Sequence, residues 1–431
     1  MDNDSTLQLN PNLKNSKKSA TLAINELSKK LQQQGKTIYR LGLGQSPFPV
    51  PQSMVDALRE AAVIKDYLAV QGLFELRTAI CHYIERTENV KFTESQVIVG
   101  PGSKELMYIL QNVLNTDLLL PAPSWVSYQP QASLCGLECF WIPCSIKNDW
   151  KLTASQFEQY AQKHSSAKLM ILNSPNNPSG ACYTDKELEA IAEVARKHHI
   201  IILSDEIYSA LSYQQHTSLS RFYPEGTIIS NGISKWSGAG GWRLGFMAIP
   251  DQLKSVTEAM VVFASETYTS VSAPIQYAAV HAFEDSDEMR QYINSTQNIM
   301  RFLAQSFSEK LNQLSVTCPK PMGGFYVMCQ FDQYKERLKK VGINSSTQLC
   351  ERFLNDIGVA CLPGDDFGLD GQLYSVRFAL VDFNGDDAIK QYVQLGDIGF
   401  TDLNCIYKNI FSAAKAIESW LFDLNILSSQ A

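Results

Sequence analysis

The sequence predicts an α/β protein whose mostly parallel β-sheet is covered by helices on both faces, together with a smaller α+β unit. Two observations support this prediction. Short, continuously apolar segments alternate with amphipathic helical patterns through the middle of the chain, and such strands are typical of a parallel sheet buried on both faces. After about residue 310 the pattern changes to the strand-like segments GGFYVMCQF and YSVRFAL, which indicates the smaller unit.

The expected strands of the large sheet follow one another along the chain, with a helix or loop between them. They cover residues 96–99, 118–120, 169–175, 200–203, 226–232 and 243–250. Ligands of such sheets bind outside the carboxyl ends of the strands. We therefore expect the functional residues directly after these strands.

Local signals mark several helices. Ser53 is the expected N-cap of a helix that contains MVDALREAA. Thr184 and Glu187 form an expected capping box for the helix that follows them. The segment KELMYILQNVL, residues 104–114, reads as a helix after a Gly-Pro-Gly turn, and the apolar spacing over residues 406–421 predicts a C-terminal helix.

Length and composition limit the possible classes of protein. The 431 residues exceed the usual size of one domain and predict about two to three structural units. Hydrophobic residues make up 45% and charged residues 19%, which excludes global disorder and indicates a large interior. The net charge of −7 argues against nucleic acid or an anionic membrane as a partner, although a local basic pocket for phosphate remains compatible with it. No apolar run approaches the ~18 residues of a membrane span.

The ten cysteines give no sign of a disulfide framework or a metal site. Cys135, Cys139 and Cys144 lie closest together, but they lack the paired CxxC spacing or the nearby histidine that zinc sites use. We interpret them as free thiols and expect no metal. Because no secretory apolar segment precedes the polar first residues, we expect a reduced, cytoplasmic protein with a loose N-terminal tail.

Four short segments after the expected strands carry the chemistry. They are Gly102-Ser-Lys104, NSPNNPSG at 173–180, SDEIY at 204–208, and Ser234-Lys235 followed by GWR at 241–243. The first would suit a phosphate through its backbone N–H groups and hydroxyl. Taken singly, the first three have ordinary explanations as a βα turn, a loop turn and a helix cap. A lysine at the end of an apolar strand is harder to explain as a surface residue. P-loop, zinc-protease and nucleophile-elbow motifs do not occur, and the six histidines are interpreted as surface or packing residues.

Together, these segments and the late VR of YSVRFAL resemble the fold-type-I, pyridoxal-5′-phosphate-dependent aminotransferases of class I/II, and Gly-Trp-Arg after the lysine is similar to their aspartate/aromatic branch. The resemblance covers about residues 20–425. It implies a fold-type-I transferase that binds pyridoxal 5′-phosphate. The expected division is a flexible tail at 1–18, a large cofactor-binding domain at 51–309, and a small domain formed by 19–50 and 310–431.

The resemblance implies specific roles around the cofactor ring. Lys235 would form the internal Schiff base with the aldehyde and then act as the general base and acid of the proton shift. Asp205 would pair with the pyridine nitrogen and keep it protonated, so that the ring accepts electrons. Tyr208 and Asn177 would donate to the phenolic oxygen, and Trp125 would stack on the ring.

The same resemblance implies how the phosphate is bound. Gly102, Ser103 and Lys104 would form the phosphate cup at a helix start, with Arg243 as a fixed charge. Ser234 is a further phosphate-binding candidate.

Substrate and partner residues follow from the resemblance as well. Arg377 would bind the α-carboxylate by a bidentate pair, with Asn177 beside it, and Gly44 would let its backbone approach the substrate. Tyr67 resembles the tyrosine that reaches the cofactor phosphate of the other subunit, which implies a homodimer with shared active sites.

The sequence departs from the family pattern at two places. The segment that begins at Gly44 reads GQSPFPVP, where the family often has Asp-Phe after the proline. Between Lys235 and Gly241 the chain has WSGAG, where Met-Thr is frequent before Gly-Trp-Arg. No residue matches the second arginine that binds distal carboxylates in aspartate enzymes. The identity of the amino acid substrate is therefore open.

The expected reaction is transamination between an L-α-amino acid, of aspartate or aromatic type, and a 2-oxo acid, with 2-oxoglutarate as the expected acceptor. The alternative is a pyridoxal-phosphate lyase, such as a β C–S lyase, because Lys235, Asp205 and Arg377 serve both reactions. A transcription regulator with this domain is disfavoured, since the first twenty residues leave no room for a helix-turn-helix module.

Overall fold

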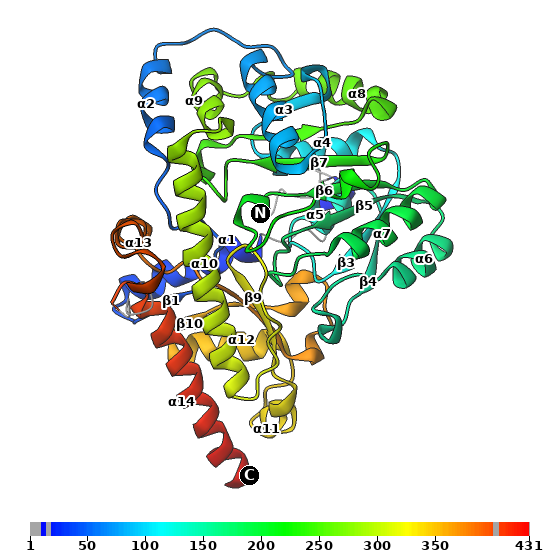
Figure 1. The fold of residues 1–431 in the computed structure, drawn as a ribbon. Coiled ribbons are helices and arrows are strands. Elements are labelled where there is room, and N and C mark those ends of the chain that lie inside the picture. The colour runs from blue at the N-terminus through cyan, green and yellow to red at the C-terminus, as the bar shows by residue number, and fades with distance from the viewer. Residues whose placement is uncertain (1–9, 14–18, 400–404, 431) are drawn as a thin grey trace, which may run out of the picture.

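The computed structural model describes residues 10–13, 19–399 and 405–430 (Figure 1). Its main sheet has seven strands in the order β2-β8-β7-β6-β5-β3-β4. Their bounds are β2 Val97–Gly100, β3 Asp117–Ala122, β4 Cys139–Pro143, β5 Ala167–Asn173, β6 Ile201–Asp205, β7 Thr227–Gly232 and β8 Gly245–Ala248. Only β8 runs antiparallel to its neighbours in this sheet. The predicted mostly parallel sheet is confirmed.

Helices cover both faces of this sheet. They are α2 Gln52–Ala61, α3 Phe74–Glu88, α4 Ser103–Val113, α5 Tyr128–Leu134, α6 Ala154–Lys163, α7 Asp185–His198, α8 Lys254–Ser265 and α9 Ala273–Phe283. Alternate residues of the central strands face opposite sides, as the period of two requires. Leu119 and Met170 pack with α6 and α7, whereas Leu118 and Leu169 pack with α4, α5 and α8. The apolar runs in the sequence therefore reflect burial on both faces.

A smaller unit contains a three-stranded antiparallel sheet and a two-stranded parallel one. The first joins β11 Leu362–Pro363, β12 Ser375–Ala379 and β9 Tyr326–Gln330; the second joins β1 Tyr39–Arg40 and β10 Val359–Ala360. The helices of this part are α1 Ala20–Gln33, α11 Lys335–Lys340, α12 Ser346–Ile357, α13 Gly385–Gly399 and α14 Lys408–Gln430. The pairing of β1 with β10 brings the N-terminal and C-terminal segments together, which supports the proposed composition of the small domain.

The long helix α10, Asp287–Gln313, runs from the large unit down to the small one (Figure 1). The proposed domain boundary at residue 310 falls in its last turn. Of the proposed tail at 1–18, only residues 10–13 are described, and Asn12 there donates its side-chain amide to the Leu134 carbonyl. The rest of the tail lies outside the described residues.

One helix start differs from the prediction. Helix α2 begins at Gln52 after Pro51, so the N-cap assignment of Ser53 is wrong. The Glu288 carboxylate accepts from the backbone N–H groups of Gln52 and Ser53, at 2.8 and 3.3 Å, and this distant side chain replaces a local cap. The capping box of Thr184 and Glu187 is confirmed, and its helix α7 ends at His198.

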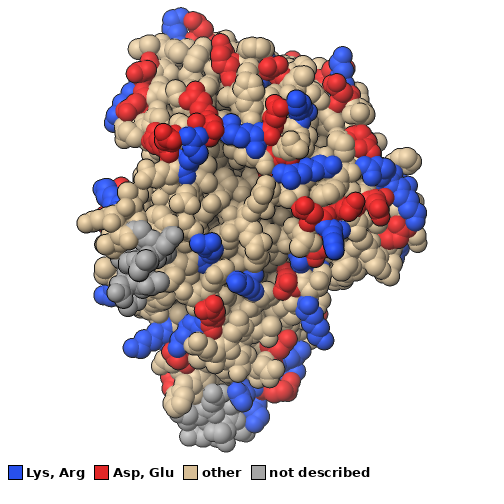
Figure 2. All heavy atoms as spheres, in the orientation of Figure 1, with Lys and Arg blue, Asp and Glu red and all other residues tan. Residues whose placement is uncertain are grey.

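Charged side chains of both signs are interspersed on the face of the molecule shown in Figure 2. Within the described residues, no helix combines the length and the apolar character needed to cross a membrane.

Cys135, Cys139 and Cys144 are free thiols, and burial raises the pKa of Cys144 to about 12.

Candidate active site

A cavity of about 600 Å³ lies where the carboxyl ends of the parallel strands face the small unit. Strands β5 and β6 end in register, with Asn173 opposite Asp205. Every residue predicted for the site lines this cavity except Gly102, which precedes its wall, and Tyr67, which lies elsewhere. The predicted residues on the wall are Gly44, Ser103, Lys104, Trp125, Asn177, Asp205, Tyr208, Ser234, Lys235, Arg243 and Arg377. The structure thus brings together segments that are far apart in the sequence.

Lys235 is half-buried, because its side chain borders the cavity and protein atoms surround the rest of it. Its Nζ donates a hydrogen bond to the Gly44 carbonyl at 2.9 Å. Loss of hydration lowers the pKa of Lys235 to about 8, and the cations of Arg377 and Arg243 act in the same direction, while Asp205 opposes them. An amine with this pKa exchanges its proton near neutral pH.

Asp205 is the buried carboxylate of the site. Burial raises its pKa to about 6, and hydrogen bonds from the Tyr128 hydroxyl and the Ile207 backbone N–H partly oppose this rise. The Tyr128 hydroxyl donates to Asp205 Oδ2 at 2.5 Å. The Asn173 side chain donates to the Asp205 carbonyl at 2.7 Å and accepts from the Asn177 backbone N–H at 2.7 Å. These bonds hold the loop after β5 against the end of β6.

Arg377 is fully buried on β12. Its Nη1 donates to Asn177 Oδ1 at 3.3 Å, and its Nη2 donates to the Gly42 carbonyl. Its Nε is buried without a hydrogen-bond partner, and burial lowers the pKa of the guanidinium. Among the described residues, no carboxylate pairs with it at ion-pair distance. The guanidinium is therefore free to bind an anion that enters the cavity.

A second group of cations surrounds the start of α4. Arg243 donates to the carbonyls of Gly240 and Pro101 at 3.0 and 3.1 Å, and the Lys104 ammonium lies 4.9 Å from the centre of the Trp125 ring. Gly102 has a φ of +90°, and a Cβ there would lie 2.2 Å from Arg243 Nη2. Glycine is thus required for Arg243 to lie against this turn. The backbone N–H groups at the helix start and the Arg243 guanidinium are groups that suit an anion.

Tyr67 lies in the loop between α2 and α3 and is 89% exposed. It does not line the cavity of its own chain.

Comparison with known proteins places this geometry in a family. The family described as "Aminotransferase class I and II" matches residues 36–382. The chain belongs to this family. It is 34% identical over 365 residues to an aspartate aminotransferase of Geobacillus stearothermophilus, covering 81% of this chain and 89% of that protein. It is 31% identical over 353 residues to aromatic-amino-acid aminotransferase 2 of Thermococcus litoralis, covering 78% and 86%.

A solved structure of Thermus thermophilus aspartate aminotransferase with maleate superimposes on this aminotransferase with a TM-score of 0.82 at 26% identity, covering 95% of this chain and 99% of that one. The resemblance inferred from the motifs and the fold class are confirmed. Members of this aminotransferase family use pyridoxal 5′-phosphate.

The two departures from the family pattern meet in this aminotransferase. Gly238, within WSGAG, has a φ of +70°, and a Cβ there would lie 2.4 Å from the carbonyl oxygen of Phe48, within GQSPFPVP. A larger residue at 238 would collide with the backbone of the other segment. The two segments therefore pack directly against each other, and each contributes a residue, Gly44 or Gly240, to the cavity wall.

Sequence reasoning missed several residues of the site. Tyr128 and Tyr326 both contact predicted site residues. The only local signals were the position of Tyr128 three residues after Trp125 and the two glycines before Phe325. The start of α1 also lines the cavity, and no signal indicated this; its residues there are Ser19, Thr21, Leu22 and Asn25.

A buried ion cluster contacts the loop after β5, which carries Asn177 of the site. Atoms of Glu88, Glu206 and His216 lie within 4.8 Å of one another, a spacing that would also suit a metal ion. However, His216 Nδ1 faces Glu88 Oε1 at 2.7 Å and Nε2 faces the Ser174 carbonyl at 3.1 Å. Because both partners are acceptors, both ring nitrogens carry protons and neither has a lone pair for a metal. The imidazolium instead ties Glu88 to the loop that carries Asn177.

We expect the His216→Gln variant of the aminotransferase to lose about 3 kcal/mol of unfolding free energy at pH 6. The variant removes the cation nearest to the buried Glu88 carboxylate and leaves it only the Arg221 guanidinium at 3.7 Å and the Ser218 backbone N–H as partners. The pKa of His216 is raised by Glu88 and Glu206 against the effect of burial. A raised histidine pKa stabilises the fold below the unfolded-state pKa, and this stabilisation is lost as pH rises through the folded-state pKa. The difference in unfolding free energy between parent and variant should therefore become smaller at high pH. Urea unfolding at several pH values measures this difference.

His281→Gln is the matched control, because His281 pairs with Glu284 on the surface, where both side chains are more than 40% exposed. It should lose less than about 1 kcal/mol. Equal losses in the two variants would contradict the buried ion pair.

Proposed function

We propose that this aminotransferase transfers the amino group between aspartate or an aromatic L-amino acid and 2-oxoglutarate, with pyridoxal 5′-phosphate as its cofactor. The observation that carries the proposal is the meeting of Lys235, Asp205 and Arg377 on the wall of one cavity. The names of the relatives support aspartate and aromatic amino acids as donors.

The residues present fit this cofactor. When bound, it supplies an aldehyde that condenses with amines and a pyridine ring that withdraws electrons from the attached carbon. Asp205 would hold the ring nitrogen, since a cation beside this buried carboxylate would favour its charged form. The backbone N–H groups at Ser103 and Lys104, with Ser234 and Arg243, would hold the phosphate.

Lys235 is the proposed point of covalent attachment and the proton carrier. Its lowered pKa of about 8 leaves part of the amine unprotonated at neutral pH, so Nζ would take the proton from the substrate Cα and later return it. The Gly44 carbonyl, 2.9 Å from Nζ, would keep the amine oriented within the cavity. No other described lysine except Lys104 lines the cavity, and Lys104 lies over Trp125.

Arg377 is the proposed receptor for the substrate α-carboxylate. Burying a guanidinium without an anionic partner is costly, and a carboxylate would compensate for this with a bidentate pair. Asn177 contacts the same guanidinium and would set its orientation. Trp125 would cover one face of the cofactor ring.

The function is tested by supplying the purified protein with the cofactor, 2-oxoglutarate and a panel of amino acids. We expect glutamate and the matching 2-oxo acid in equal amounts, most rapidly with aspartate or an aromatic donor. Pyruvate and ammonia from a β-substituted donor, without glutamate, would instead indicate the lyase reaction.

The matched control for this assay is Lys235→Ala, which should form no glutamate. Borohydride should fix the cofactor covalently to the parent protein at the peptide with Lys235, and should fix none to the variant. Attachment at another lysine would make the assignment of Lys235 wrong.

We expect Arg377→Lys to react with α-amino acids at least tenfold more slowly, because the ammonium keeps the charge but loses the planar fork. Amines without a carboxylate should react equally with variant and parent, as measured by single-turnover rates. An equal loss for both kinds of amine would mean that Arg377 supports the fold and not the substrate.

We further propose a homodimer in which Tyr67 reaches the cofactor phosphate of the partner subunit. Tyr67 and Val63 are 89% and 84% exposed, and Phe74 and Val262 are also exposed. Aromatic side chains are enriched at protein interfaces, and the exposure of Tyr67 is consistent with one. Closed twofold symmetry is the commonest arrangement of homo-oligomers.

Mixing two impaired variants tests the shared site. In a mixed dimer of Tyr67→Arg and Lys235→Ala, one site carries both defects and the other carries neither. An equal mixture should therefore recover about one quarter of parent activity, since about half of the dimers are mixed and each has one intact site. A monomer by sedimentation, or mixed dimers without recovered activity, would rule out sharing.

A further inference from the structure

Tyr326 is the first residue of β9 and is only 2% exposed, yet it borders the cavity. It pairs with Ala379 on β12, two residues from Arg377. Residues two apart on a strand share one face of the sheet, so Tyr326 and Arg377 are diagonal neighbours across the pair. The Arg377 guanidinium carbon lies 4.7 Å from the centre of the Tyr326 ring, which is cation–π distance.

The hydroxyl of Tyr326 lies 3.0 Å from the hydroxyl of Tyr208. A Cβ on Gly44 would lie 1.8 Å from the Tyr326 oxygen, so only glycine at this position leaves room for the hydroxyl. The two tyrosine rings are nearly perpendicular, at 84°. The rings therefore contact each other edge to face, with their centres 5.6 Å apart, while the two hydroxyls lie within hydrogen-bond distance.

The direction of this hydrogen bond determines what Tyr208 offers to the cavity. A phenol has one proton. If Tyr208 donated to Tyr326, its proton would be used there, whereas if Tyr326 donates, the Tyr208 proton is free to point into the cavity. Burial raises the pKa of Tyr326, but Arg377 acts against this rise. Either hydroxyl can donate in this contact, but the cation on the Tyr326 ring makes that phenol the stronger donor and favours the bond that runs from Tyr326 to Tyr208.

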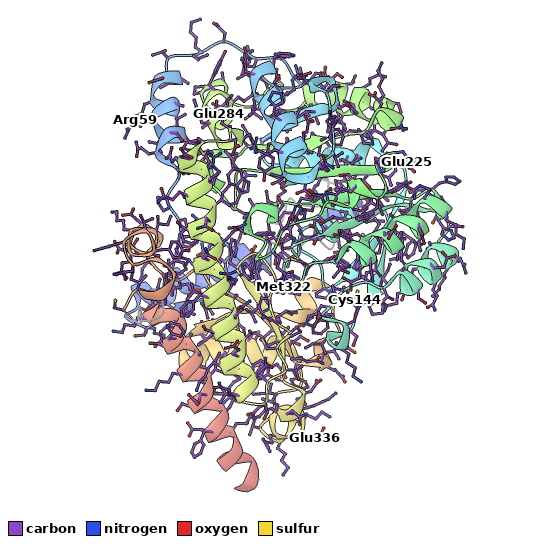
Figure 3. The ribbon with its side chains drawn as sticks, in the orientation of Figure 1. Arg59, Cys144, Glu225, Glu284, Met322 and Glu336 are labelled. Atoms are coloured by element: carbon purple, nitrogen blue, oxygen red, sulfur yellow. The ribbon has the colours of Figure 1, made fainter. Side chains whose placement is uncertain are left out.

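The backbone around Tyr326 is held on both sides. Met322, labelled near the middle of the molecule in Figure 3, donates its N–H to the Gly180 carbonyl at 2.8 Å, and its own carbonyl accepts from Tyr213 at 2.8 Å. On the other side, the Leu380 N–H donates to the Phe325 carbonyl at 2.8 Å. The start of β9 is thus fixed to the loop after β5 and to β12 together.

We infer that Tyr326 is a positioning residue with two separable effects: its hydroxyl directs the Tyr208 proton into the cavity, toward an oxygen anion on the ring of the bound cofactor, and its ring holds the Arg377 guanidinium in place for a carboxylate. This inference rests on the proposed function for the identity of the cavity's ligands. The two effects belong to different parts of one side chain, so two substitutions separate them.

Tyr326→Phe removes the hydroxyl and keeps the ring. Loading the protein with pyridoxal 5′-phosphate and titrating its absorption without substrate measures the acidity of the bound chromophore. Losing one aligned donor should raise the midpoint by about half a unit to one unit, from the usual net strength of a hydrogen bond. The dissociation constant of maleate, a dicarboxylate that does not react, should change by less than about twofold.

Tyr326→Leu also removes the ring. It should raise the midpoint similarly and weaken maleate binding by about fivefold or more, because the support for the guanidinium is lost. Tyr334→Phe is the matched control, since the Tyr334 hydroxyl donates to the Leu314 carbonyl at 2.7 Å and Tyr334 does not line the cavity. It should leave both the midpoint and maleate binding unchanged.

The outcomes separate this inference from the proposed function. If the parent transaminates but Tyr326→Phe has the same midpoint as Tyr334→Phe, the directing role of the hydroxyl is wrong while the function stands. If Tyr326→Phe weakens maleate binding as much as Tyr326→Leu, the ring has no separate role. If Tyr326→Leu does not fold, the midpoint of the Phe variant still decides the directing role. A parent that binds no cofactor would overturn the proposed function and this inference together.

Discussion

Charged groups held away from water with few partners are the constraint on which the rest of this structure depends. Lys235 and Arg377 share the wall of a cavity in which Asp205 is the one predicted carboxylate. The raised pKa of Asp205, about 6, corresponds to a cost of about 3 kcal/mol for the charged form. A cation beside Asp205 would lower this cost, and an anion beside Arg377 would lower the separate cost of burying that guanidinium. Binding and folding are therefore expected to support each other.

The surrounding architecture keeps these groups from relaxing. Strands β5 and β6 end at one level of a sheet buried on both faces, so Asn173 and Asp205 have fixed neighbours. Beneath the loop after β5, the His216 imidazolium binds the Ser174 carbonyl and Glu88 at once. Moving the loop after β5 away from the cavity would break its hydrogen bonds to Asp205 and to His216. Rigidity of this kind holds charged groups ready without a reorganisation step.

The cavity is built by both structural units, so its wall combines residues from distant parts of the chain. The large sheet supplies Asp205 and Lys235, the small antiparallel sheet supplies Arg377 and Tyr326, and the N-terminal segment supplies Gly44. The segments GQSPFPVP and WSGAG, which depart from the family pattern separately in the sequence, pack together at Gly238. Because both segments also border the cavity, we expect substrate preference to depend on the contact between them and not on either segment alone.

The sequence by itself determined the sheet, its buried strands, the capping of α7 and half of the residues on the cavity wall, because these features are carried by short local patterns. Only the tertiary structure decided the rest. Tyr128 hydrogen-bonds to Asp205, 77 residues away in the sequence; Tyr326 contacts Tyr208, 118 residues away; and Glu88 pairs with His216, 128 residues away. Helix α2 begins where Glu288, 236 residues away, binds its first N–H. A hydrogen bond between distant segments depends on distance and burial in space, and no local pattern of residues encodes these.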